Sequence, residues 1–457
     1  MAEKKIRNCE GYDKVGSIAT SIEDGFTLTA VGDIIDSRVL TKGKMHGFDE
    51  VVKLIQSADA DVTFGNFEGS IFDIKSFKGS PQAEYGGAYH VSIPAVAPDL
   101  RKMGFDLMSY ANNHTMDWGP EGMRETEKHL ENAGIVYSGS GETLAEASAA
   151  RFLDTPHGRV GLVSLSTTFP PLFRAADPVR EAPGRPGVCA VRVNHYVTVL
   201  PEMMDTLRKI RNALSFRPPV DDNSDTVVLA ANFASTVCKV GDKIESCYYQ
   251  NQKDVENILW NVRRGKQFSD FLIVSVHSHQ PGNAYAYPAE YQREFAHALI
   301  DAGADAYIGH GPHRLRGIEI YKGRPIFYSL GNFIMDDLRT PVGMDMFEEQ
   351  GRDPITSTDA EVTVAEMKGG YVSEPGFTEQ DFYESLLTTS RFENDQIAEI
   401  KLYPLELNQE LRFADRGVPR RAPQDRAQTI LELLQEYSAP FGTKIEIENG
   451  VGIIRLQ

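Results

Sequence analysis

Short apolar segments alternate with helical patterns over most of residues 25–335. The apolar segments are nearly continuous, which is typical of strands buried on both faces of a sheet. The predicted strands lie at 26–31, 61–64, 105–110, 159–166, 226–233, 270–276, 305–309 and 325–330, and the predicted helices at 51–60, 121–133 and 288–303. This order of elements predicts an α/β fold, in which helices cover the faces of a sheet.

Two stretches interrupt the pattern. Residues 170–225 are rich in Pro, Arg and Asp and contain one helical segment, at 197–213, so we interpret them as an insertion or cap. Residues 336–395 are acidic and weakly periodic, which predicts a long irregular excursion near the functional site. We expect both stretches to shape the entrance of a pocket.

The core is expected to span residues 25–335, with residues 1–24 as an N-terminal extension. Regular patterns return in residues 396–457. A predicted strand at 396–407 and a helix at 425–439 precede a hairpin at 443–456 that turns at Asn449-Gly450. We expect this C-terminal part to complete the core.

Side chains that can bind metal ions appear within about three residues of the ends of the predicted strands. They are Asp33, Asn66, Glu68, Asn112, Asn113, His114, His277, His279, His310, His313 and Asn332. In open α/β sheets, ligands bind beyond the carboxyl ends of the strands. The sequence therefore predicts that these side chains gather at one edge.

The types of these residues indicate the kind of chemistry. Neutral imidazoles, carboxylates and amide oxygens suit Mn, Zn or Fe, whereas thiolates would indicate a structural zinc site. Our hypothesis is one or two divalent metal ions, which lower the pKa of a water molecule for attack on an electrophilic centre. A nearby imidazole would protonate the leaving group.

Each motif is ordinary on its own. Asp33 after a strand can equally be a turn or helix cap, and a lone histidine on an apolar strand is more often a core residue. The pairs His277/His279 and His310/His313 are more specific, because their spacing can direct two imidazoles at one point. The joint occurrence of all these motifs favours a metal site.

Charge and cysteine content restrict the possible functions. The net charge is −18, from 47 basic and 65 acidic residues, and there is no long Lys/Arg-rich run, so we expect no nucleic-acid partner. The four cysteines have no CxxC spacing, which disfavours a disulfide framework. With no long apolar run and no apolar stretch behind the basic N-terminus, we expect no membrane span and a cytoplasmic location.

Four segments point to a known family. They are GDIIDSR (32–38), GNFEGS (65–70), SYANNHTMDWG (109–119) and GADAYIGHGPHRLRGIEIYKGRPIFYSLGNFI (303–334). They resemble the CapA family of capsule-synthesis proteins, a branch of the calcineurin-like metallophosphoesterases. The resemblance covers roughly residues 25–335 and implies a four-layer α/β sandwich with insertions.

The resemblance also implies roles for individual residues. The implied metal ligands are Asp33, Glu68, Asn113, His277, His310 and His313. Glu68 corresponds to the carboxylate that bridges two metal ions, and Asn66 has a supporting role beside it. His114 corresponds to the acid that protonates a leaving group.

Three positions depart from the family pattern. Ile35 stands where the typical phosphoesterase has a histidine, a loss that CapA members share. His277-Ser278-His279 replaces His-Trp-Gly, and Gly311 replaces the second of two adjacent histidines. His279 either supplies the missing imidazole or acts as a separate acid/base, and we assign it, with His114, a catalytic role.

Five polar residues are candidates for substrate binding: Arg38, Asn66, Asn112, Asp117 and Arg314. Each arginine suits an anionic group, although a salt bridge for Arg38 and a solvated strand edge for Arg314 are ordinary alternatives. Asp117 can hold the tautomer of a histidine or cap a helix. His297 lies in the middle of a helix beside its apolar face, which favours a packed or solvated ring.

Three functions are compatible with these features. The first is a metal-dependent hydrolase of a phosphoester or amide-like substrate, and the second is a metal-assisted epimerase of a peptide or amino-acid derivative, which the extra His279 favours. The third is a non-catalytic subunit that binds a capsule polymer, which the intact ligand set disfavours. We expect a small-molecule, peptide or anionic polymer substrate, such as poly-γ-glutamate.

Overall fold

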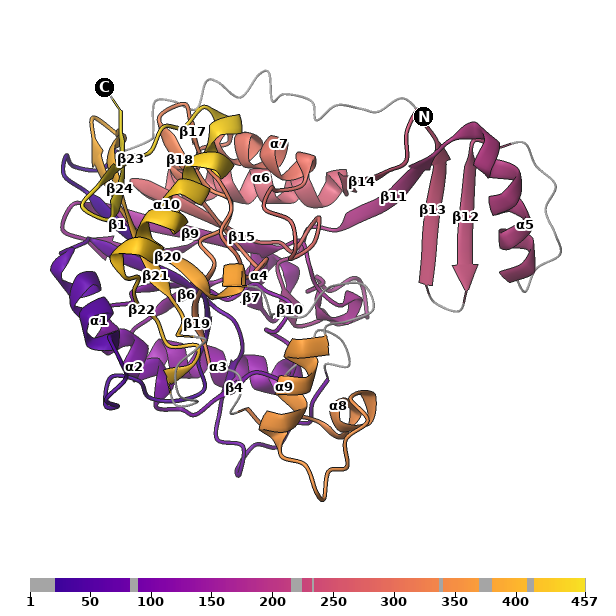
Figure 1. The fold of residues 1–457 in the computed structure, drawn as a ribbon, viewed down its shortest axis with the longest axis horizontal. Coiled ribbons are helices and arrows are strands. Elements are labelled where there is room, and N and C mark those ends of the chain that lie inside the picture. The colour runs from indigo at the N-terminus through magenta and orange to yellow at the C-terminus, as the bar shows by residue number, and fades with distance from the viewer. Residues whose placement is uncertain are drawn as a thin grey trace.

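Two β-sheets face each other in the computed structural model (Figure 1). The structure describes residues 21–82, 89–214, 224–231, 234–336, 340–369, 380–408 and 415–456. The predicted N-terminal extension therefore lies largely outside the described residues.

The first sheet has ten strands and is built around β1 (Thr27–Ile35). On one side of β1 lie the parallel strands β2 (Val62–Phe67), β5 (Leu107–Ser109) and β6 (Val136–Ser138). On the other side lie β20 (Glu384–Glu393), β21 (Gln396–Glu406), β24 (Val451–Arg455) and β23 (Glu446–Glu448), all in antiparallel pairs. Short strands β19 (Asn332–Met335) and β22 (Arg420–Arg421) pair with β1 and β21.

The second sheet has six strands in the order β17, β18, β16, β15, β9, β8. Their bounds are Ile318–Tyr321, Arg324–Phe327, Ala306–His310, Phe271–His277, Gly158–Ser166 and Arg151–Thr155. The central strands β9, β15, β16 and β18 are parallel. Both sheets thus bring the carboxyl ends of buried parallel strands to an edge.

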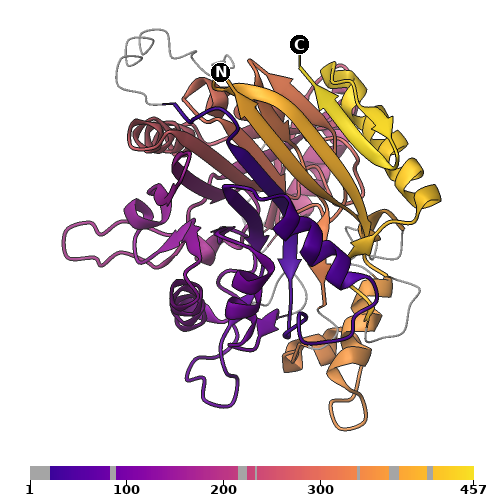
Figure 2. The same ribbon diagram turned by 90° about the vertical axis from the view of Figure 1, so that its left-hand side faces the viewer.

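Helices on the two outer faces complete four layers. Helices α1 (Phe48–Ser57), α2 (Val96–Met103) and α3 (Gly119–Asn132) pack on the first sheet, and α1, in indigo, lies across that face in Figure 2. Helices α6 (Gln252–Gln267) and α7 (Glu290–Asp301) pack on the second sheet. The predicted four-layer α/β sandwich is confirmed.

The inter-sheet core explains why the strands read as nearly continuous apolar runs. Leu28 and Ala30 of β1 point into the core between the sheets, whereas Val31 and Ile34 point to the outer helices. Because both faces of β1 are buried, the polar alternation of a half-exposed strand is absent. Helix α10 (Gln424–Ser438) adds Ile430, Leu431 and Leu434 to the same core.

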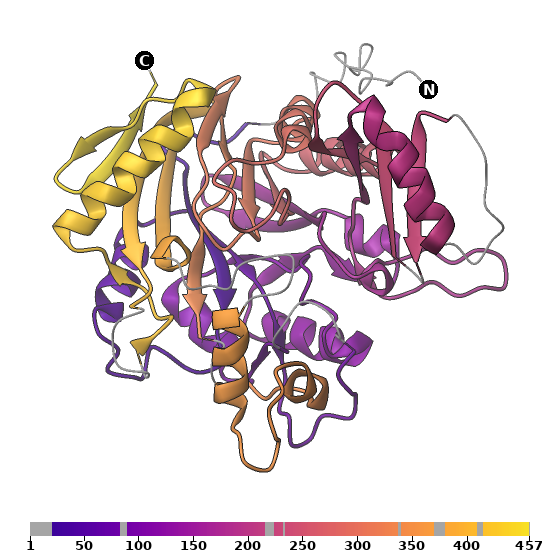
Figure 3. The ribbon, with the colours of Figure 1, turned by 45° about the vertical axis from the view of Figure 1, so that its right-hand side comes forward.

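The described residues between 193 and 250 include a separate four-stranded sheet that projects from the body (Figures 1 and 3). It contains β11 (Val193–Val199), β12 (Thr226–Ala231), β13 (Ala234–Val240) and β14 (Glu245–Gln250), with α5 (Met204–Leu214) on one face. The predicted start of the helix at 197–213 is wrong, because residues 197–199 belong to β11. The sheet also continues past residue 225, where we expected the insertion to end.

The strand predicted at 226–233 exists as β12 but is not a core strand. Only the α5 side of its sheet is covered, so Val227 is buried while Val228 is 44% exposed. Residues 232 and 233 lie outside the described residues. An apolar run of β-branched residues identified the strand but not the layer to which it belongs.

The stretch 336–395 is more regular than expected. It contains α8 (Met344–Glu349), α9 (Asp359–Gly369) and the whole of β20, which pairs with β1. The expectation of an irregular segment is wrong for β20, in which Ser385, Thr388 and Ser390 are polar but buried; Thr388, for example, donates a hydrogen bond to the carbonyl oxygen of Ala30. Residues 337–339 and 370–379 lie outside the described residues.

In the C-terminal part, β21, α10 and the β23–β24 hairpin lie at the positions expected for a strand, a helix and a hairpin. Asn449 and Gly450 at its turn have φ angles of +52° and +76°, as a two-residue hairpin turn requires. The remaining short elements are β3 (Ser70–Ile71), β4 (Val91–Ser92), β7 (Ser140–Gly141), β10 (Gly187–Val188) and α4 (Leu144–Ser148). Within the described ranges, no helix has the length and apolar character needed to cross a membrane.

Phe271 is a sensitive test of the contact between the sheets. Its ring centroid lies 4.8 Å from those of both Phe26 and Phe392, which belong to the other sheet or its approach. Phe271→Ala should reduce the free energy of unfolding by about 3–5 kcal/mol, because it leaves a cavity between the layers. Urea unfolding followed by circular dichroism measures this change.

Phe268→Ala is the matched control, because Phe268 is 54% exposed and only three positions away. Its effect should be within about 0.5 kcal/mol. Equal losses in the two variants would contradict the assignment of Phe271 to the inter-sheet core.

Candidate metal centre

The predicted strand-end residues meet where the carboxyl ends of the two sheets come together. Asp33 is in β1 and Asn66 is in β2, directly opposite it in the ladder. His277 and His310 end the neighbouring strands β15 and β16 and are register partners. The parallel pairing within each sheet therefore fixes which side chains can approach one another.

The first group of possible metal ligands consists of Asp33, His277 and His310, all buried, with ligand atoms within 4.8 Å of one another. Asp33 Oδ1 lies 3.6 Å from His310 Nδ1 and 4.0 Å from His277 Nδ1. Asn66 donates a hydrogen bond of 2.8 Å to Asp33 Oδ1, and the Gly311 N–H donates one of 3.0 Å to Asp33 Oδ2. These two donors hold the Asp33 carboxylate in place.

The second group consists of Glu68, His279 and His313, again with ligand atoms within 4.8 Å of one another. His277, a member of the first group, also contacts the second group. Its Nδ1 is 2.9 Å from His310 Nδ1, and its Nε2 is 3.0 Å from His279 Nε2. Glu68 Oε1 is 3.6 Å from His277 Nε2. The two groups are therefore adjacent parts of one cluster.

Three histidines are oriented by a hydrogen bond at one ring nitrogen. His310 Nε2 contacts Ser275 Oγ at 2.5 Å, His313 Nδ1 contacts Asn332 Oδ1 at 2.8 Å, and His279 Nδ1 contacts Asn283 Oδ1 at 2.8 Å. Such partners orient histidine ligands in metal sites. The other nitrogens of two of these rings, His310 Nδ1 and His279 Nε2, face His277.

Burial sets the charge state of the cluster. It lowers the pKa of His310 to about 3 and that of His313 to about 4, and it also lowers the pKa values of His277 and His279. These imidazoles are therefore neutral at pH 7, as metal ligands must be.

The carboxylates shift in the opposite direction. Burial raises the pKa of Asp33 to about 7, and burial together with the charge of Asp33 raises the pKa of Glu68 well above its usual value. Both Glu68 carboxylate oxygens are buried without a hydrogen-bond partner among the described residues. Two buried carboxylates among neutral imidazoles fit a divalent cation, whose charge would compensate them.

His114 lies beside the cluster, and Asn113 directly precedes it in the chain. His114 Nδ1 is 2.7 Å from Asp117 Oδ2, and its Nε2 is 3.9 Å from Glu68 Oε1. Asp117 thus orients the imidazole so that its other nitrogen faces the cluster. Asn113 Oδ1 is buried and has no hydrogen-bond partner among the described residues, which leaves it available as a ligand.

Gly311 explains one departure from the family pattern. Its φ is +113°, and a Cβ atom there would lie 2.9 Å from Ser278 N and 3.2 Å from His277 Nε2. A side chain at position 311 would therefore be strained and would crowd His277. His279 occupies the cluster instead, which favours its interpretation as the missing imidazole over that as a separate acid/base.

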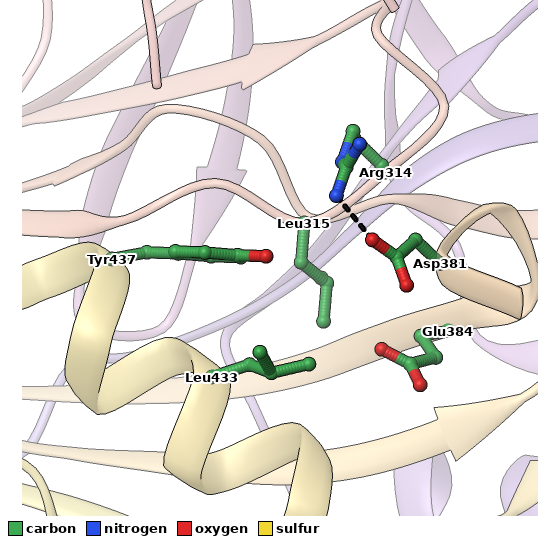
Figure 4. Close-up of a pocket in the computed structure, with 6 residues that line it drawn as sticks. All are labelled: Arg314, Leu315, Asp381, Glu384, Leu433 and Tyr437. Atoms are coloured by element: carbon green, nitrogen blue, oxygen red, sulfur yellow. Dashed lines mark hydrogen bonds and ion pairs between the residues drawn. The ribbon is translucent and has the colours of Figure 1, made fainter. Parts of the chain in front are cut away.

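The two candidate arginines contact protein carboxylates. Arg38 forms a 2.7 Å ion pair with Asp336. Arg314 forms an ion pair with Asp381 (Figure 4). It also donates a hydrogen bond of 2.8 Å to the carbonyl oxygen of Ala284. The cavity beside Arg314 has a volume of about 10 Å³, room for about one water molecule, so these contacts favour a structural role.

Two further candidates, Asn112 and His297, have different positions. Asn112 donates to Phe67 O at 2.7 Å and to Asn66 Oδ1 at 3.3 Å, so it supports the β2 end. His297 lies away from the cluster, 3.0 Å from Glu319 and stacked on Tyr321.

Sequence reasoning missed three residues of the site: Ser275, Asn283 and His90. Ser275 could have been found, because it lies two residues before His277 on β15 and so on the same face of the sheet. No sequence signal marks Asn283, which contacts His279 from an irregular loop. The His90 ring centroid lies 4.3 Å from that of His114, although 24 positions separate them.

A four-layer α/β sandwich with a ligand cluster at the strand ends is the architecture of the metallophosphoesterase-like proteins. The family model described as "Bacterial capsule synthesis protein PGA_cap" matches residues 27–337. The chain belongs to this family, and the expected resemblance to CapA is confirmed.

Individual relatives differ in how much of the chain they match. "Uncharacterized protein y4sH" of Sinorhizobium fredii (strain NBRC 101917 / NGR234) is 56% identical over 449 residues, which are 97% of this chain and 96% of that protein. "Capsule biosynthesis protein CapA" of Bacillus anthracis is 25% identical over 315 residues, 68% of this chain and 60% of that protein. A solved structure, of a hypothetical protein from Thermus thermophilus, has a TM-score of 0.36 at 13% identity, over 83% of this chain and 99% of that chain.

The ligand assignment predicts metal loss from single substitutions. Glu68→Gln and His310→Ala should each weaken binding of Mn²⁺ or Zn²⁺ by more than about 100-fold, because even partners of metal ligands change affinity by 10–100-fold. Metal analysis after dialysis measures the change. His297→Gln is the control and should keep wild-type content; equal content in all four proteins would rule out the cluster as the metal site.

The pKa values also predict a pH dependence. A metal ligand must be deprotonated, so protons compete with the metal below the pKa of about 7 of Asp33. The apparent affinity for Mn²⁺ should rise about tenfold or more per pH unit from about pH 5.5 to 7, with Glu68 adding to the slope. Calorimetric titration measures this slope, and a pH-independent affinity would contradict the assignment of Asp33.

Proposed function

We propose that this protein is a metal-dependent hydrolase of the capsule-synthesis family, acting on a phosphoester or amide-like bond. The observation that supports it most is the adjacency of the two ligand groups, joined by His277, with the unpartnered Glu68 carboxylate between imidazoles. A non-catalytic binding subunit would have no need for a buried pair of carboxylates, of which Glu68 has no hydrogen-bond partner among the described residues, because such a pair is unfavourable in the absence of a cation.

The residues that would hold the metal are Asp33, Glu68, Asn113, His277, His279, His310 and His313. Two adjacent groups have room for one or two ions, and the imidazole-rich donor set suits Mn, Zn or Fe. A divalent cation in this position supplies Lewis acidity, which makes water a better nucleophile at neutral pH.

His114 is the proton donor in this proposal. Its Nδ1 is fixed by Asp117, so the proton that a leaving group needs would come from Nε2, the nitrogen that faces the cluster. Asn66 and Asn112 hold the β2 end and would keep Glu68 in position.

The substrate class follows from the family. The relative from Bacillus anthracis is named for capsule biosynthesis, and we propose a peptide, small molecule or anionic polymer with a phosphoester or amide-like bond as the substrate. The feature that favoured an epimerase was a free His279. Its position with Glu68 and His313 supports a ligand role for that imidazole instead.

The role of His114 can be tested with two substrates that differ only in leaving group. With Mn²⁺, wild-type protein should hydrolyse p-nitrophenyl phosphate or bis-p-nitrophenyl phosphate. His114→Asn should lower kcat by about 10²–10⁴-fold on phenyl phosphate, and by less on p-nitrophenyl phosphate, because nitrophenolate leaves without a proton. Bound metal should be unchanged.

Asp117→Asn should lower kcat in the same direction, and His297→Gln should have no effect. A complete absence of turnover on all these esters, together with deuterium uptake at a substrate α-carbon in D₂O, would refute hydrolysis and support epimerisation. An equal loss on both leaving groups would refute His114 as the proton donor.

A further inference from the structure

His90 is held beside the metal centre by the strand that follows Glu68. The N–H of Ser70 donates a 2.9 Å hydrogen bond to the carbonyl oxygen of His90, and β3 pairs with β4 directly after this contact. The main chain at position 90 is therefore held by Ser70, which lies two positions after Glu68 in the chain.

Gly69 allows the close approach of His90. Its φ is +151°, and a Cβ atom there would lie 3.0 Å from the Cβ of His90 and 3.3 Å from its carbonyl oxygen. The backbone thus brings the His90 side chain against the Glu68 loop at a position where a larger residue would interfere.

The His90 ring faces the proposed proton donor. Its centroid lies 4.3 Å from that of His114, with an interplanar angle of 57°. Burial lowers the pKa of His90 well below its usual value, so the ring is neutral.

The buried ring nitrogen of His90, Nδ1, makes no hydrogen bond with the described residues. The side chain is 7% exposed, and Nδ1 is buried without a partner among the described residues. A ring needed only for packing against His114 could be apolar, because an unpaired buried nitrogen is unfavourable. A neutral imidazole carries one N–H, which can donate to an acceptor oxygen.

We propose that His90 is a substrate-binding residue, whose ring N–H donates a hydrogen bond to an anionic oxygen of the substrate on the leaving-group side of the centre. The oxygen would belong to a phosphate or a carboxylate group. This inference rests on the proposed hydrolase function, because it places the leaving group beside His114. His90 is not a metal ligand in this arrangement.

The test compares two substitutions at one position. His90→Phe keeps a ring against His114 but removes both nitrogens, whereas His90→Asn restores a polar group close to the position of Nδ1. Binding of inorganic phosphate and of glutarate to Mn²⁺-loaded protein is measured by calorimetry, after metal analysis of each variant. Phosphate and glutarate distinguish the two kinds of anionic group.

We expect unchanged metal content in both variants and about tenfold weaker binding of one probe by His90→Phe, with partial recovery in His90→Asn. Loss with phosphate alone identifies a phosphate group, and loss with glutarate alone identifies a carboxylate. Equal affinities in wild type and His90→Phe, or no binding of either probe by the wild type, would overturn the inference. Loss of metal from the His90→Phe variant would also overturn the inference.

Failure of the proposed function would be recognised separately. A wild-type protein that held no metal would refute the hydrolase, and the same comparison of probe binding on metal-free protein would still decide whether His90 binds anions.

Discussion

The structure depends on the burial of two carboxylates, Asp33 and Glu68, among neutral imidazoles. Each carboxylate is withdrawn from water at the end of a parallel strand, and only Asp33 receives hydrogen bonds from the described protein. Such an arrangement is unfavourable unless positive charge enters it. The strand ends, the histidine orientations and the tight backbone contacts around them all maintain this arrangement.

The two-sheet architecture makes that arrangement possible. One sheet supplies both carboxylates, from β1 and from the chain directly after β2, and the other supplies His277 and His310 from β15 and β16. Neither sheet alone holds a complete ligand group. The inter-sheet core, which includes Phe26, Phe271 and Phe392, therefore also sets the distances within the site.

Much of this could be predicted from sequence because buried parallel strands are nearly all-apolar and end at polar side chains. The core strands and the strand–helix–hairpin at the C-terminus followed from such patterns. The strand β20 could not be found in this way, since the polar residues Ser385, Thr388 and Ser390 stand at buried positions of the strand. The sequence also could not show which ligands form each of the two groups, because each group combines residues from the strand ends of both sheets and depends on how the sheets pack. His90 shows the same limit, since its contact with His114 comes from a two-residue strand pair.

Positions 279 and 311 are coupled through His277. A Cβ atom at position 311 would lie 2.9 Å from Ser278 N and 3.2 Å from His277 Nε2, and His279 Nε2 lies 3.0 Å from the same nitrogen. A side chain at position 311 would therefore crowd the ring that His279 contacts. A substitution at either position has to be interpreted together with the residue at the other, because both act on the same imidazole.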